Sequence, residues 1–168
     1  MRKFELQALR CPFDGKELSI KQEEKWKGEN LLEGKLACVD GHEWSITEGF
    51  PSLVSIDEIS EEDLKWISQY DEHAEEYDEQ VKIYDDFLKT DITKEREQLL
   101  KTVLLKESSR IVDISIGTAA NFMAMDKVFP NKMRKVSLYG IELSRGMLKV
   151  AKRKLEAKGL NCILVHAD

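Results

Sequence analysis

The sequence is poor in cysteine and proline, and it lacks any long apolar run. Three cysteines, an odd number spread widely along 168 residues, argue against a disulfide framework. No stretch approaches the roughly 18 apolar residues that a membrane helix requires, and the N-terminus lacks the apolar core of a secretion signal. We therefore expect an intracellular, cytoplasmic protein that has no membrane partner.

Charge is plentiful but uneven along the chain. Residues 1–55 carry 8 Lys/Arg and 10 Asp/Glu, residues 56–99 carry 5 and 16, and residues 100–168 carry 13 and 6. The acidic middle and the basic end either attract one another, within or between chains, or form solvated helix faces. No part has the dense basic stripe of a dedicated nucleic-acid module.

Residues 110–168 alternate between strand and helix patterns. The β-branched run 110–116 predicts a buried strand, which leads into a turn of small residues at 115–119 and a helix ended by Pro130. Residues 136–141 predict a second strand ending at Glu142, and Ser144 is the expected N-cap of a helix that ends near Gly159. Residues 161–168 predict a third strand. The order βαβαβ predicts an α/β fold with half of a doubly wound sheet.

Three motifs in this region resemble those of class I S-adenosylmethionine (SAM)-dependent methyltransferases, especially the ubiquinone/menaquinone C-methyltransferase-like group. They are "VDISIGTAAN", "LYGIELSRGMLKVAKRK" and "ILVHAD". That family has Asp-x-Gly-x-Gly-x-Gly in the first motif, and this chain has Ser, Gly and Ala at the three glycine positions. The resemblance implies a Rossmann-like fold and a SAM site formed by Asp113, Ser115, Gly117, Ala119, Glu142, which holds the ribose, and Asp168, which meets the adenine amino group.

The pattern of residues 56–91 predicts an acidic linker followed by an amphipathic helix, either one long helix or two joined helices. Ser60 is the expected N-cap, and apolar residues recur every three or four positions from Leu64 to Leu88. The run Tyr70–Asp78 is similar to the Tyr-Asp-x-x-Ala-x-x-Tyr-Asp opening of many small-molecule methyltransferases. That resemblance implies a lid over the cofactor in which Tyr77 faces the SAM pocket. The alternative is that both tyrosines are core positions.

Residues 1–55 form a separate unit with two short turns, Cys11–Gly15 and Cys38–His42. The segment resembles the zinc ribbon at the head of certain ribosomal-RNA guanine methyltransferases and the small zinc-binding activator of tRNA and protein methyltransferases. Those ribbons have three cysteines and one histidine, whereas this chain has an aspartate at the second position. The resemblance implies a zinc site of Cys11, Asp14, Cys38 and His42. The alternative is a metal-free ribbon in which Cys11 and Cys38 are small buried residues. The aromatic residues Trp26, Trp44 and Phe50 are expected to fill the thin core of this unit, and a partner-binding surface is the alternative.

The predicted domains are therefore 1–55, a zinc-ribbon-like domain, 56–91, a linker and lid, and 92–168, the first half of a SAM-binding domain. Class I methyltransferases have seven strands, whereas only the first three are predicted here. The first strand would therefore lie at an exposed apolar edge of the sheet. A fragment of a longer protein, self-association across that edge, or a separate partner would each resolve this, and we expect a fragment. The functional hypothesis is methyl transfer to a small molecule or to RNA. The alternatives are a non-catalytic zinc-ribbon interaction or regulatory module and an RNA-binding protein.

Overall fold

The chain forms two compact units in a computed structural model that describes residues 3–168. The first unit extends to Ile59 and includes Ile163–Asp168, and the second comprises Ser60–Cys162. The division falls at residues 59 and 60, and it places the lid segment in the same unit as the sheet that follows it. No helix in the described part of the chain is both long and apolar enough to cross a membrane.

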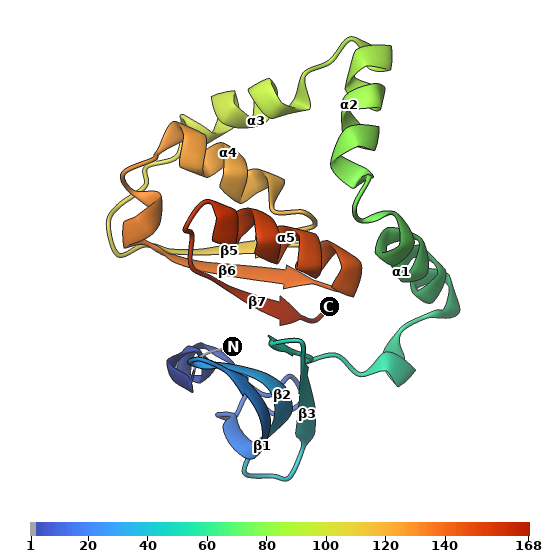
Figure 1. The fold of residues 1–168 in the computed structure, drawn as a ribbon, viewed down its shortest axis with the longest axis vertical. Helices are drawn as coiled ribbons and strands as arrows, with labels where there is room; N and C mark the ends of the chain where they lie inside the picture. The colour runs from blue at the N-terminus through green and yellow to red at the C-terminus, as the bar shows by residue number, and fades with distance from the viewer. Residues whose placement is uncertain (1–2) are drawn as a thin grey trace. The chain divides into compact units, whose positions relative to one another are not determined.

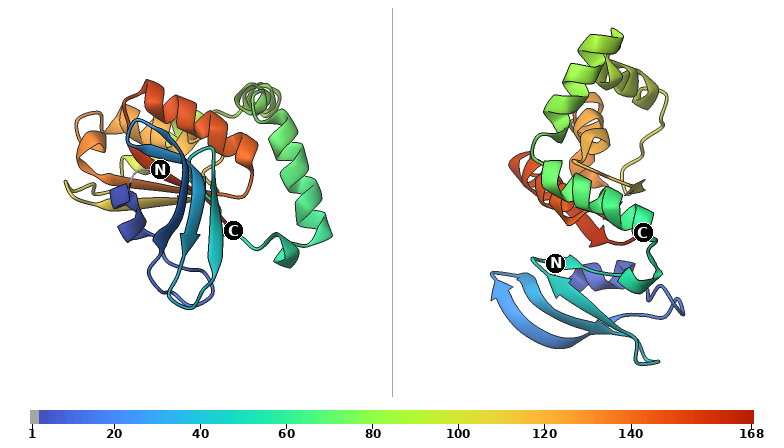
Figure 2. Two further views of the ribbon diagram at one scale, coloured as in Figure 1. Left: turned by 60° about the horizontal axis from the view of Figure 1, so that its bottom comes forward. Right: turned by 90° about the vertical axis from the view of Figure 1, so that its right-hand side faces the viewer.

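The first unit is an antiparallel sheet of four strands in the order β1-β2-β3-β4. After a short 3-10 helix, η1 (Lys3–Ala8), the strands are β1 (Ser19–Lys27), β2 (Asn30–Ala37), β3 (Glu43–Thr47) and β4 (Phe50–Pro51). β1 and β2 form a long hairpin, which is visible as the curved pair of strands in Figure 2, and Gly28 takes a left-handed conformation in its turn (φ 60°).

One face of this sheet carries the core of the unit. Leu31, Leu36 and Ile46 are buried there, and Trp44 and Phe50 are buried as well. Half-buried Trp26 packs against the same cluster. The prediction that the aromatic residues fill a thin core is confirmed, since they supply much of the buried area of a small unit.

The predicted βαβαβ order of residues 110–168 is confirmed, and all of it up to Cys162 belongs to the second unit. It runs β5 (Arg110–Ile114), α4 (Ala120–Val128), the short η3 (Met133–Lys135), β6 (Ser137–Glu142), α5 (Arg145–Ala157) and β7 (Cys162–His166). The sheet order is β5-β6-β7, and β5 pairs with β6 in parallel. Figure 1 shows α4 and α5 lying over the same face of β5 and β6. The carboxyl ends of these two strands thus lead into turns at one edge.

Three helices precede this sheet: α1 (Glu61–His73), α2 (Tyr77–Leu88) and α3 (Ile92–Leu100). α1 packs against α5, and α3 packs against α4 (Figure 1). Ser60 caps α1 as predicted, with its Oγ accepting a hydrogen bond from the Asp63 amide at 3.1 Å. The amphipathic segment is thus two joined helices. α3 starts after its Asp91 cap and ends at Leu100.

The apolar positions of α1 and α2 do not form a buried face. Neither helix contains a buried residue, and within the predicted apolar series only Ala74, at the joint between the helices, is buried. The interpretation of Tyr70 as a core position is wrong, because its ring is substantially exposed. The apolar spacing predicted the helices correctly. The helices contact the rest of the unit through the carboxylates of Asp71 and Asp78 and through the apolar packing of Ala74 and Tyr77.

Candidate functional site

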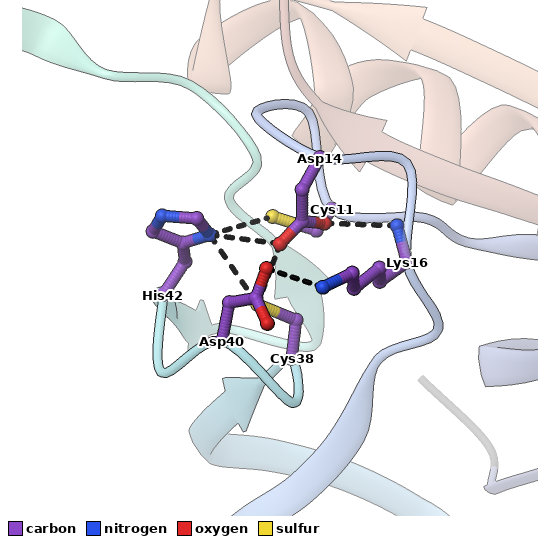
Figure 3. A network of polar contacts seen from close by, with 6 residues as sticks. All are labelled: Cys11, Asp14, Lys16, Cys38, Asp40 and His42. Carbon is purple, nitrogen blue, oxygen red and sulfur yellow. Dashed lines mark hydrogen bonds and ion pairs between the residues drawn. The ribbon is translucent and has the colours of Figure 1, made fainter.

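Two tight turns in the first unit bring four potential metal ligands together (Figure 3). In the first turn the Gly15 amide donates to the Cys11 carbonyl at 2.8 Å, and in the second the Gly41 amide donates to the Cys38 carbonyl at 3.1 Å. Gly15 and Gly41 have φ of 69° and 88°, a region that glycine enters without steric cost. The two turns therefore point their side chains at a common centre.

The spacing of the donor atoms suits a tetrahedral zinc ion. One side-chain donor from each of Cys11, Asp14, Cys38 and His42 lies within 4.8 Å of all the others. His42 Nδ1 is 3.1 Å from Asp14 Oδ2, 3.3 Å from Cys38 Sγ and 3.5 Å from Cys11 Sγ. Zinc bonds of about 2.3 Å to sulfur and 2.0–2.1 Å to nitrogen or oxygen imply neighbouring donors roughly 3.3–3.8 Å apart. An expansion of a few tenths of an ångström would admit the ion.

The surroundings of Asp14 favour its ionised, ligating form. The Lys16 amide donates to Asp14 Oδ1 at 2.8 Å, which leaves Oδ2 directed at the other donors. That backbone hydrogen bond is the main reason why the pKa of Asp14 falls to about 2. Burial raises the pKa of the Cys38 thiol, and the hydrogen bond to Asp14 raises it further. A dication at the centre would reverse the effect on the thiol, because zinc is bound by the thiolate.

Phe13, Lys16 and Asp40 surround the four donors. Phe13 packs edge-on against the His42 ring, with centroids 5.1 Å apart. Lys16 forms an ion pair with Asp40 across the two turns, and this pairing raises the pKa of Lys16. Two thiolates and one carboxylate would leave a zinc site with one net negative charge, which the nearby ammonium group offsets.

The turn between β5 and α4 is left-handed at three alternate positions. Ser115 has φ of 56°, Gly117 of 53° and Ala119 of 65°. These are the three positions at which the methyltransferase motif has glycine. Serine and alanine there hold a conformation that costs L-residues roughly 1–2 kcal/mol each. The backbone is therefore left-handed at all three positions, although only one of them is glycine.

The carboxylate of Glu142, at the end of β6, is hydrogen-bonded to this turn. Its Oε2 accepts a hydrogen bond from the Gly117 amide at 2.9 Å, and its Oε1 accepts from the amides of Leu143 and Ser144, both at 2.8 Å. The carboxylate thus links the turn after β5 to the turn after β6. Glu142 therefore also has a structural role, because it holds the two turns together.

Asp113 lies on β5 beside the same turn. Asn121 donates to its Oδ1 at 2.9 Å, while Oδ2 is buried and has no hydrogen-bond partner. Burial raises the pKa of Asp113, although the hydrogen bond from Asn121 and the charge of Arg96 oppose this. A buried carboxylate oxygen without a partner is costly, and it fits a position where a ligand donates a hydrogen bond.

The Tyr70–Asp78 run attaches the helices to α5 and to the turn. Asp71 Oδ1 accepts hydrogen bonds from Ser144 Oγ at 2.6 Å and from the Gly146 amide at 2.7 Å. A Cβ on Gly146 would lie 2.7 Å from the Asp71 carbonyl oxygen and 3.1 Å from Ala74 Cβ. The aspartate and the alanine of the motif therefore set how closely α1 approaches α5.

The second aspartate of the motif makes a similar contact with the turn itself. Thr118 Oγ1 donates to Asp78 Oδ1 at 2.6 Å, and Lys154 Nζ on α5 pairs with Asp78 Oδ2 at 2.6 Å. Thr118 is buried, and the lysine amine also lies 3.2 Å from its hydroxyl. Asp71, Asp78, Thr118 and Lys154 were not predicted as site residues. The repeated Tyr-Asp pair was the signal that could have found the two aspartates.

The two remaining predicted cofactor residues differ in their placement. Tyr77 starts α2, packs partly against Ala74, Met147 and Val150, and lies edge-on to Tyr70 with ring centroids 6.1 Å apart. Burial raises its pKa, and Glu142 contributes to this shift. Asp168 is exposed and belongs to the other compact unit.

Comparisons with known proteins give a similarity to a solved structure. No family model matches the chain, and no curated protein matches it. A crystal structure of a SAM-dependent methyltransferase from Clostridium acetobutylicum ATCC 824 aligns with 55% of this chain, at 21% sequence identity and a TM-score of 0.41. The alignment spans 37% of the length of that protein.

Proposed function

We propose that the second unit belongs to a SAM-dependent methyltransferase and binds the cofactor at the turn 115–119. The supporting observation is the left-handed backbone at Ser115, Gly117 and Ala119, next to a strand-end carboxylate. Such a turn brings backbone amides close to a ligand at the start of a helix. α4 starts at this turn without a side-chain cap, whereas Ser144 caps α5.

Each nearby side chain has a role in this proposal. Glu142 accepts hydrogen bonds from the ribose hydroxyls, and the unpartnered oxygen of Asp113 accepts one from the amino-acid part of the cofactor. Tyr77 covers the turn from α2. The cofactor supplies an electrophilic methyl group on a sulfonium. The side chains hold and orient it, and positioning is the main requirement of methyl transfer.

The methyl acceptor in this proposal is a small molecule rather than RNA. Two of the basic residues on α5 already form ion pairs with carboxylates that precede the sheet in the sequence. Arg153 pairs with Glu75, and Lys154 pairs with Asp78. The segment 56–99 carries 16 acidic and 5 basic residues, which would repel a phosphate backbone. RNA remains the second candidate acceptor, and it predicts salt-dependent RNA binding by this chain.

A matched pair of glycine variants tests the cofactor proposal. Gly117 and Gly159 both have left-handed φ, and neither has an atom within 4 Å of an added Cβ. Valine therefore strains the backbone at both positions, but only Gly117→Val adds bulk to the proposed cradle. Calorimetric titration with S-adenosylhomocysteine should show at least tenfold weaker binding for Gly117→Val and near-normal binding for Gly159→Val. Equal binding by both variants would place the cofactor elsewhere, and absence of binding by the wild type would favour a non-catalytic interaction module.

The first unit has a separate proposed role as a zinc-stabilised head. The spacing of Cys11, Asp14, Cys38 and His42 supports this, because those four donors converge from two turns of a unit whose core is small. Zinc there would link the two turns and stabilise the fold, and it would take no part in methyl transfer. Elemental analysis of the purified chain tests it, with about one zinc per chain expected. A chain that stays metal-free after refolding with zinc would support the metal-free ribbon.

A further inference from the structure

Helix α2 has few ties to the rest of the second unit. It contains no buried residue, and its N-terminus has no side-chain cap. Asp85 accepts hydrogen bonds from the Thr90 hydroxyl at 2.7 Å and from the Ile92 amide at 3.1 Å, both just beyond the end of the helix. Among residues 3–168, only Asp78 joins an α2 side chain to α5 or to the turn 115–119 by a hydrogen bond or ion pair. One carboxylate, together with the partial packing of Tyr77, therefore holds the start of this helix.

Three side chains from three elements form a closed triangle of hydrogen bonds, which we name the Asp78 triad. Thr118 Oγ1 donates to Asp78 Oδ1 at 2.6 Å, and Lys154 Nζ donates to Asp78 Oδ2 at 2.6 Å and to Thr118 Oγ1 at 3.2 Å. Thr118 is buried, whereas the side chains of Asp78 and Lys154 are 43% and 28% exposed. Charge-assisted hydrogen bonds of this kind are stronger than neutral ones. The partial exposure lets water replace the partners when the triad opens.

Thr118 connects the triad to the proposed cofactor site. It follows Gly117, whose amide is hydrogen-bonded to Glu142. The proposed function gives the backbone amides of this turn to the cofactor. The start of α2 is thus fastened beside those amides, and Tyr77, which precedes Asp78, is placed with it.

The helices on either side of α2 are anchored separately. Asp71 holds α1 on the start of α5 through two hydrogen bonds, and Glu97 holds α3 on α4 through an ion pair with Lys127 at 2.6 Å. Short connections, 74–76 and 89–91, join α2 to these neighbours. The start of α2 can therefore move away from the turn while α1 and α3 keep their own contacts.

We propose that Asp78 is a positioning residue: through its triad it holds the start of α2, and with it Tyr77, against the turn 115–119. The cofactor enters and leaves when the triad opens. The backbone of the turn is the same in both states, because Asp78 contacts only a side chain of the turn. Loss of the triad should therefore shorten the residence time of the cofactor without preventing its binding. This inference rests on the proposed cofactor site.

Rates of cofactor exchange in variants of the full chain test this role. Thr118→Val removes the hydroxyl with little change in side-chain volume, and Thr118→Ser restores it. Surface plasmon resonance with S-adenosylhomocysteine should show a dissociation rate constant at least roughly tenfold higher in Thr118→Val, an association rate constant within about threefold of the wild type, and near-normal rates in Thr118→Ser. A residue that only shaped the turn would slow association instead. Asp78→Asn, which loses the charge that attracts Lys154, should act like Thr118→Val and takes its place if that chain does not fold.

Thr90→Val is the matched control. It removes a hydroxyl that donates to another carboxylate of α2, Asp85, at 2.7 Å, but Thr90 lies outside the proposed site. Its dissociation rate constant should equal that of the wild type. Hydrogen exchange of the ligand-free chain adds a measurement that does not depend on the cofactor. Amides at the start of α2 should exchange faster in Thr118→Val, whereas those of α3 should not.

The outcomes distinguish this inference from the cofactor proposal. A wild type that does not bind S-adenosylhomocysteine would overturn both. A wild type that binds, together with unchanged dissociation in Thr118→Val and Asp78→Asn, would overturn the role of the triad alone. Failure of Thr118→Ser to restore the rates, or an effect of Thr90→Val as large as that of Thr118→Val, would also overturn that role.

Discussion

The amide of Gly117 donates a hydrogen bond to Oε2 of Glu142 at 2.9 Å, joining the turn after β5 to the end of β6. The two residues are 25 positions apart in the sequence. This contact places a carboxylate against a left-handed turn at the start of a helix, and the proposed cofactor site is built around it.

Replacing Glu142 with glutamine should weaken binding of S-adenosylhomocysteine at least tenfold, equivalent to about 1.4 kcal/mol. The amide keeps one acceptor oxygen for the turn but loses charge and one acceptor, which the ribose hydroxyls require. Calorimetry would measure the affinity. Glu72→Gln, at an exposed position on α1, is the control and should bind normally. Equal affinity in the two variants would remove the ribose role of Glu142.

Ser115→Gly should raise the free energy of unfolding by up to about 1 kcal/mol, because glycine relieves the left-handed strain at φ 56° and offsets part of that gain by its own entropy. Urea denaturation would measure the change. The control is Ser137→Gly on β6, which should destabilise the chain, since glycine weakens a strand. A loss of stability at Ser115 as large as that at Ser137 would show that the turn is not strained.

Gly146→Ala should destabilise the chain by about 1–3 kcal/mol and loosen α1 from α5. The added methyl group would lie 2.7 Å from the Asp71 carbonyl oxygen and 2.8 Å from its Cα, both backbone atoms that cannot move independently. Hydrogen exchange would locate the effect, and faster exchange is expected in α1. Lys149→Ala, on the exposed side of α5, is the comparison. Unchanged protection of α1 in Gly146→Ala would argue against this docking contact.

Asp14→Cys should tighten zinc binding at least tenfold, because zinc favours thiolate over carboxylate in structural sites of this kind. Cys38→Ser should weaken it by at least as much. Competition with a chromophoric chelator would measure both affinities. Cys162→Ser is the control, since Cys162 lies outside the four-residue cluster. Zinc affinity that is the same in all three variants would refute the site.

The order of elements in the second unit could be predicted from local patterns. Ser60 and Ser144 were predicted as N-caps, and each accepts a hydrogen bond from the amide three residues later. Gly159 was predicted to follow the end of α5, and its φ of 65° confirms that. Such features depend on neighbouring residues only, which is why the sequence shows them.

The contacts across the second unit could not be predicted in the same way. Asp71 meets Ser144 and Gly146 across more than 70 positions, and no local period encodes that pairing. The apolar spacing in α1 and α2 predicted a buried face, but spacing alone does not tell which side of a helix meets the rest of the chain. The offset of the four metal-site residues, in contrast, was informative because each pair lies within one tight turn.

The measurement that tests the cofactor proposal most directly is a titration of the ¹⁵N-labelled chain with S-adenosylhomocysteine, followed by amide resonances in two-dimensional NMR. The proposal predicts saturable shifts at Ser115, Gly117, Ala119 and Glu142, including the amide that now bonds to that carboxylate. Gly15 and Gly41 should not move. Resonances that stay unchanged at millimolar ligand, or shifts confined to other parts of the chain, would contradict a cofactor site at this turn.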